Sequence, residues 1–257
     1  MVPTQVYFEH ELQVAKLPNL QRRKTAKVLM LHGHGQSGKF FYHKTKKIIE
    51  CLQIKAAAEY RKCFPGGFEL FYPNGPLQAG DDPDADVWVW GIGDFQNDLI
   101  KGIDETIIKI LGILNTHGPF IGIIGFSTGA AIAAIIASLL ERSRPARLQS
   151  YQRTEIVHPR LKFVICFSGF KLAHPGHQEL YSSLIQTPVM HIIATLDTMI
   201  SKEQTKELIS QCENNIEVYF DGTHYVPQGQ CQTNAICDFI LQSLAGHQSY
   251  EKKNNQD

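Results

Sequence analysis

The sequence lacks the segments that direct a chain to or across a membrane. Residues 1–24 do not show the basic-then-apolar order of a secretory signal. No apolar run approaches the roughly 20 residues that a membrane-spanning helix needs. We therefore expect a cytoplasmic protein without a membrane span, with access to the nucleus left open.

The chain also lacks a net charge and a CxxC pair of cysteines. Lysine plus arginine equal aspartate plus glutamate at 25 each, so no global field attracts nucleic acid, an anionic membrane or an acidic partner. The six cysteines include no CxxC pair, and several stand in apolar stretches. We expect free thiols and no metal site, and the sequence indicates neither a cofactor nor a particular protein partner.

Short apolar segments separated by helical patterns begin after residue 26. Strands are predicted at 27–31, 68–72, 121–125, 161–167, 189–194 and 216–220, and helical patterns at 44–60, 94–115, 129–144 and 202–212. Apolar strands separated by helices predict a parallel sheet covered on both faces.

This pattern predicts one α/β domain over residues 27–245. Before it we expect an irregular lead-in over residues 1–26. After it, residues 246–257 are polar and are expected to be disordered. Residues 73–94 are rich in glycine, proline and aspartate, which predicts a long surface connection.

A GxSxG motif, Gly125 to Gly129, stands between the apolar segment 121–125 and the helical pattern that follows it. A sharp strand-to-helix turn of this kind exposes a serine in strained backbone geometry and needs small residues two places before and two places after it. The turn also puts Ser127 at a helix N-terminus, where free N–H groups favour developing negative charge. Ser127 is therefore predicted to be a nucleophile.

A serine hydroxyl needs a base to take its proton and an acid to orient that base. Among eleven histidines, His224 is favoured because it follows the last predicted strand. Asp197 is favoured as the acid because it follows the strand 189–194 and lies between Ser127 and His224 in the chain. Asp221, three residues before His224, is the alternative acid.

The loop after the first predicted strand, His32 to Gly35, is expected to complete an oxyanion hole. The backbone N–H groups of Thr128 and His34 are the predicted donors. The same loop also matches GxxxxGK, the phosphate-binding pattern that ends here at Lys39. That match fails at Phe40, where a serine or threonine hydroxyl is needed to hold magnesium.

Five segments in this order resemble the FSH family of serine hydrolases over roughly residues 27–243. They are LHGHGQSGKFFYHKT, GPFIGIIGFSTGAA, FSGF, the aspartate after HIIATL, and GTHYVP. The resemblance implies a single-domain α/β-hydrolase fold, with a mostly parallel twisted sheet and helices on both faces. It also implies the same catalytic triad of Ser127, Asp197 and His224.

Two features bear on the substrate that the resemblance implies. Family members usually carry glutamine where this chain has Thr128, so the substrate preference is expected to differ while the backbone donor is kept. The resemblance also suggests that Trp88 and Trp90 border the acyl pocket. The alternative for this pair is an ordinary strand face that packs one ring inward.

We therefore predict a serine esterase that cleaves acyl esters through an acyl-enzyme intermediate. The alternative within enzymes is a thioesterase acting on acyl chains bound to a carrier or to coenzyme A. Two further alternatives come from other classes. They are a nucleotide-binding module that uses the Lys39 loop and a non-catalytic scaffold that keeps the fold.

Overall fold

A seven-stranded sheet forms the centre of the protein, with strand order β1-β3-β2-β6-β7-β8-β9 and every neighbouring pair parallel. The structure is a computed structural model that describes residues 3–9, 24–56, 58–82, 84–95, 97–141, 158–181 and 183–254. The strands of the sheet are β1 (Thr4–Phe8), β2 (Ala26–Leu31), β3 (Phe68–Tyr72), β6 (Phe120–Phe126), β7 (Phe163–Phe167), β8 (Val189–Ala194) and β9 (Asn215–Phe220). Two short strands, β4 (Leu77–Gln78) and β5 (Trp88–Val89), form a separate antiparallel ribbon.

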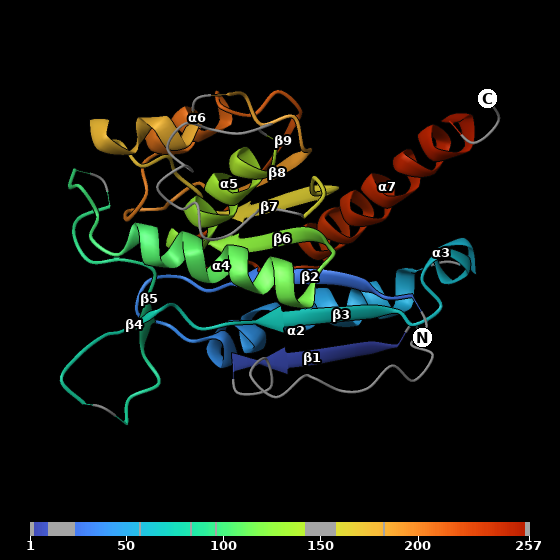
Figure 1. Ribbon diagram of the computed structural model, residues 1–257, viewed down its shortest axis with the longest axis horizontal. Coiled ribbons are helices and arrows are strands. Elements are labelled where there is room, and N and C mark those ends of the chain that lie inside the picture. Colours follow the sequence, from blue (N-terminus) through green and yellow to red (C-terminus); the bar gives the residue numbers. More distant parts are fainter. Residues whose placement is uncertain are drawn as a thin grey trace.

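Helices cover both faces of the sheet (Figure 1). One face packs against α2 (Gly38–Lys55), the short α3 (Ala58–Cys63) and α7 (Gln230–Asn254). The other face packs against α4 (Ile103–His117), α5 (Thr128–Leu140), the 3-10 helix η2 (Pro175–Tyr181) and α6 (Lys202–Ile209). The arrangement confirms the predicted α/β fold.

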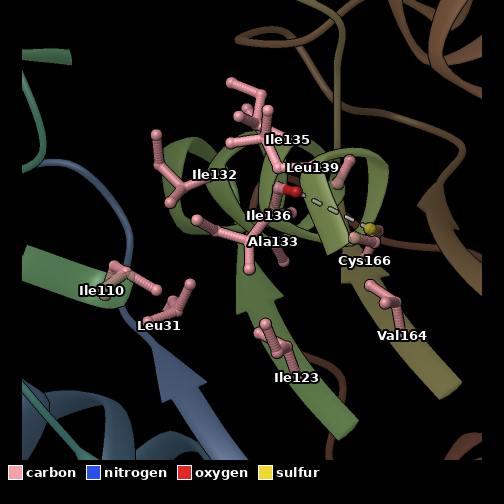
Figure 2. Close-up of a cluster of buried hydrophobic side chains, with 14 of the residues drawn as sticks. Leu31, Ile110, Ile123, Ile132, Ala133, Ile135, Ile136, Leu139, Val164 and Cys166 are labelled. Atoms are coloured by element: carbon pink, nitrogen blue, oxygen red, sulfur yellow. Dashed lines mark hydrogen bonds between the residues drawn. The ribbon is translucent and has the colours of Figure 1, made fainter. Parts of the chain in front are cut away.

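Helix α5 is buried on every side, as its alanine-rich sequence predicts. Figure 2 shows the helix above Ile123 of β6 and Val164 of β7, which belong to the same buried cluster. The Cys166 thiol donates to the Ala130 carbonyl at 3.7 Å, which ties β7 to the first turn of the helix. The first turn of α5 is therefore held against the sheet by packing on all sides.

Three regions differ from the sequence expectations. Thr4–Phe8 form β1 instead of an irregular lead-in, because β3 supplies a parallel partner in the register Val6 to Leu70. Helix α7 continues to Asn254, where a disordered tail is expected from residue 246. Helix α4 begins at Ile103 instead of residue 94, directly after Gly102, whose φ is 85°. Residues 1–2, 10–23 and 255–257 of the expected lead-in and tail lie outside the described residues.

Among the described residues, no helix combines the length and the apolar character needed to cross a bilayer.

His191 stands in the middle of β8 and is 1% exposed. Neither ring nitrogen has a hydrogen-bond partner among the described residues. Burial lowers the pKa of His191 to about 4, because the charged imidazolium loses its hydration inside the sheet. Folding therefore favours the neutral form of this side chain.

Replacing His191 with leucine should reduce the acid sensitivity of the fold. In the unfolded chain the ordinary histidine pKa is about 6.5, so the unfolded state binds more protons below that pH. The stability that depends on neutral His191 is complete above pH 6.5 and is lost as the pH falls toward 4 and below. Wild type should lose about 2 kcal/mol between pH 7 and pH 5 through this residue, and urea unfolding at the two pH values measures the loss.

His43→Gln is the matched control, because His43 is exposed on α2. It should keep the wild-type pH dependence. An equal fall in stability for wild type and His191→Leu would contradict the assignment.

Candidate active site

The turn between β6 and α5 holds Ser127 in strained backbone geometry, with φ 54° and ψ −119°. Its N–H donates to the Phe167 carbonyl at 2.8 Å, which anchors the turn to β7. A Cβ atom on Gly125 would stand 2.3 Å from the carbonyl oxygen of Gly129. One on Gly129 would stand 2.3 Å from the carbonyl oxygens of both Leu31 and His32. Both glycines of the motif are therefore required by backbone contacts, as a nucleophile elbow needs.

The carboxyl ends of β6, β8 and β9 bring together three residues that are far apart in the sequence. His224 Nε2 lies 2.9 Å from Ser127 Oγ, and His224 Nδ1 lies 2.8 Å from Asp197 Oδ2. Because a carboxylate only accepts hydrogen bonds, Nδ1–H donates to Asp197 and Nε2 is left to accept the serine proton. Such an arrangement can activate a hydroxyl for attack on an acyl carbon.

Asp197 is fixed by more than the histidine. Its Oδ1 accepts the N–H groups of Met199 and Ile200, each at 2.9 Å, and its side chain is 5% exposed. Burial opposes its ionisation, but hydrogen bonds from His224 and from the Ile200 N–H outweigh burial, so the pKa of the Asp197 carboxyl is lowered. The alternative acid, Asp221, is exposed and accepts from the Thr195 hydroxyl instead.

His32 and Trp90 brace the loop that follows β2. The Gly75 N–H donates to His32 Nε2 at 2.9 Å, and His32 Nδ1 lies 2.7 Å from the Gly33 carbonyl. The Trp90 indole N–H donates to the His32 carbonyl at 2.7 Å, and the two rings lie 4.7 Å apart. Burial lowers the pKa of His32 to about 4, which keeps Nε2 free to accept.

The predicted oxyanion donors lie on segments in direct contact. Gly129 touches the His32 carbonyl, so the first turn of α5 packs against the start of the loop that carries His34. Thr128 is 4% exposed, and its hydroxyl has no hydrogen-bond partner among the described residues. The backbone N–H of Thr128 heads the helix, where it has no intrahelical acceptor.

The phosphate-binding interpretation of this loop does not fit its hydrogen bonds. The Gly38 N–H donates to Asn74 Oδ1 at 2.8 Å, and the Phe40 N–H donates to the Ser37 hydroxyl at 3.1 Å. A phosphate cradle needs such N–H groups free at the helix N-terminus. Here side chains of the protein already use them.

The two tryptophans predicted at the pocket have different environments. Trp90 is fully buried, and its indole N–H donates to the His32 carbonyl. Its ring is therefore not exposed as an open pocket wall. This is the inward-packed ring that the alternative interpretation describes for one member of the pair. Trp88 is half-buried, and its indole N–H donates to Asp86 at 2.9 Å. Its place at the acyl pocket stays a prediction.

Ser168, a residue to which the sequence assigns no role, lies at the same end of the sheet. It follows β7, is 3% exposed and has φ 45°. Apart from Ser127, it is the only residue other than glycine with positive φ in the described part of the chain. Burial raises the pKa of Asp197, and the Ser168 side chain helps to lower it, after the hydrogen bonds from His224 and the Ile200 N–H. The FSGF segment is the only sequence signal that points to it.

Comparison with known proteins identifies relatives. The model of the serine hydrolase (FSH1) family matches residues 21–236. A Schizosaccharomyces pombe protein named dihydrofolate reductase is 30% identical over 237 residues, which are 85% of this chain and 47% of that protein. The chain thus spans about half the length of that relative. Esterase OVCA2 of Xenopus tropicalis is 26% identical over 243 residues, covering 89% of this chain and 98% of the relative.

A solved structure supports the fold. Acyl-protein thioesterase 2 of Zea mays superposes with a TM-score of 0.57 at 16% identity, covering 88% of this chain and 97% of that one. At this identity the likeness shows the α/β-hydrolase fold alone.

Gly129→Ala should destabilise the protein by at least about 3 kcal/mol, because the new methyl group meets two backbone carbonyls that packing holds in place. Gly112→Ala is the matched control. It makes the same change inside α4, where an added Cβ atom has no neighbour within 4 Å. That variant should gain up to about 1 kcal/mol from helix propensity. Chemical denaturation compares them, and equal stabilities would contradict the steric account.

Proposed function

This chain belongs to the serine hydrolase (FSH1) family, and from that membership we propose that it cleaves acyl esters with Ser127 as nucleophile, His224 as general base and Asp197 as the orienting acid. The hydrogen-bonded relay from Asp197 through His224 to Ser127 carries the assignment. All three residues follow strands of one parallel sheet, at the edge where ligands bind in open α/β folds.

In the first half of the reaction, His224 Nε2 takes the proton of Ser127 while Oγ attacks the acyl carbon. The tetrahedral intermediate collapses, and His224 gives that proton to the leaving oxygen. Ionised Asp197 stabilises the imidazolium that forms between these two steps. The products are a free alcohol and an acyl group bound to Ser127.

In the second half, water replaces the alcohol. His224 takes a proton from the water as its oxygen attacks the acyl carbon, and it returns a proton to Ser127 Oγ as the carboxylic acid leaves. The N–H groups of Thr128 and His34 are the proposed donors to the oxyanion in both halves. The hydrogen bonds that brace His32 would keep the His34 donor in place.

Thioesters form the second substrate class, because the same steps release a thiol in place of an alcohol. The ratio of kcat/KM on oxygen esters and thioesters with the same acyl group distinguishes the two. We also propose a cytoplasmic location, which agrees with six cysteines that are all free.

Ser127→Ala should lower kcat by about 10⁴-fold or more on a short 4-nitrophenyl ester, because it removes the attacking atom. A fluorophosphonate probe should label wild type and leave the variant unlabelled. Undiminished hydrolysis by the variant would refute the nucleophile. Labelling of both proteins would show that another residue reacts.

Asp197→Asn should lower kcat by about 10³-fold or more, because an amide in place of the carboxylate no longer holds the Nδ1–H tautomer. Asp221→Asn makes the same chemical change at an exposed carboxylate bonded to Thr195. It should stay within about threefold of wild type. Steady-state kinetics on one ester compares both variants, and a larger loss at Asp221 would reverse the assignment of the acid.

A further inference from the structure

Lys44 of α2 lies against the aromatic ring that precedes the nucleophile. Its Nζ is 4.7 Å from the centre of the Phe126 ring and 4.9 Å from the centre of the Phe40 ring. The same Phe126 ring lies 4.9 Å from the His224 imidazole. The ammonium is therefore within about 10 Å of the imidazole centre, a distance at which partly buried charges still interact.

This cation has no anionic partner in the described part of the chain. The ion pairs there join Lys55 to Asp238, Lys109 to Glu9 and His224 to Asp197. Lys44 is half-buried, and burial lowers the pKa of its ammonium group. Two aromatic faces compensate only part of the lost hydration. An anion beside Nζ would compensate for the rest of the hydration that the ammonium group loses.

The position of Lys44 relative to His224 indicates which part of a substrate would meet it. His224 must deliver its proton to the leaving oxygen or sulfur, so the leaving group lies next to the imidazole. Lys44 contacts Phe126, the ring that borders this imidazole. The cation and the imidazole thus contact the same aromatic ring.

Resting on the function proposed above, we propose that Lys44 recognises an anionic group, a carboxylate or a phosphate, on the alcohol or thiol that leaves. The preferred substrates are then acyl esters or thioesters of an anionic alcohol or thiol. Lys44 is a specificity residue in this scheme and takes no part in proton transfer. A purely structural role, in which Lys44 only packs on Phe40 and Phe126, predicts no dependence on substrate charge.

Three hexanoyl-length substrates test the proposal. 4-Nitrophenyl hexanoate is neutral, 3-(hexanoyloxy)-4-nitrobenzoate carries a carboxylate on the leaving group, and mono-(4-nitrophenyl) adipate carries one on the acyl chain. Lys44→Met, which keeps an unbranched apolar stem, should lower kcat/KM for the nitrobenzoate ester about tenfold more than for the neutral ester. Lys44→Arg should keep the wild-type ratio, because it keeps the charge and stacks on the same rings.

Lys47→Met is the matched control. Lys47 is exposed on α2 one turn further along and lines a separate groove between α2 and α7. The variant changes the net charge equally and should leave the ratio of the two rates within twofold of wild type. If Lys44→Met unfolds, Lys44→Gln replaces it. Rising salt should also reduce the wild-type rate on the nitrobenzoate ester more than that on the neutral ester.

An unchanged ratio in Lys44→Met or Lys44→Gln would overturn the proposal, as would an equal effect of Lys47→Met. A loss confined to the adipate ester would overturn the assignment to the leaving group. Either result, with Ser127 still labelled and the neutral ester still cleaved, leaves the hydrolase function standing. Absence of labelling and of all ester cleavage in wild type would instead refute the hydrolase function itself.

Discussion

The close approach of α5 to the end of β2 is the contact on which the site depends. At Gly129 the helix backbone meets the carbonyl groups of Leu31 and His32 with no room for a side chain. This contact places Ser127 and the first N–H groups of α5 beside the loop that carries His34. An apolar helix buried on every side can make such an approach, because small alanine side chains let it lie flat against β6 and β7.

Around that contact, local environments hold two ionisable groups in opposite states. Burial keeps His32 neutral, so its ring accepts one hydrogen bond and fixes the loop. Asp197 is also buried, yet hydrogen bonds from His224 and two backbone N–H groups stabilise its charge. Both groups lose hydration on folding, but burial dominates at His32, whereas hydrogen-bond donors outweigh burial at Asp197.

Lys44 differs from Asp197, because this charged group has no partner of opposite charge in the described part of the chain. The chain carries equal numbers of acidic and basic side chains, so substrate charge can be recognised only locally. A cation held on aromatic faces, one of which also contacts His224, is suited to that task, because partial burial strengthens its attraction for an anion. The proposed preference for anionic leaving groups follows from this local field.

Apolar segments and small residues in the sequence predicted much of the fold and the elbow at Ser127. Their physical basis is local, because a buried strand must be apolar and a tight turn must be small. The sequence favoured Asp197 over Asp221 from its position after a strand, whereas the hydrogen bond between Asp197 and His224 arises only in the packed sheet. Likewise, β1 forms because its backbone pairs with β3, a segment distant in the sequence.

The sequence by itself thus determined a parallel α/β sheet, the elbow at Ser127 and a short set of candidate acid and base residues for that serine. Tertiary structure alone decided that the Trp90 indole braces the His32 loop, and that Lys44 and His224 contact the same Phe126 ring. Both depend on contacts between segments distant in the chain, and neither hydrophobic periodicity nor motif spacing records such contacts.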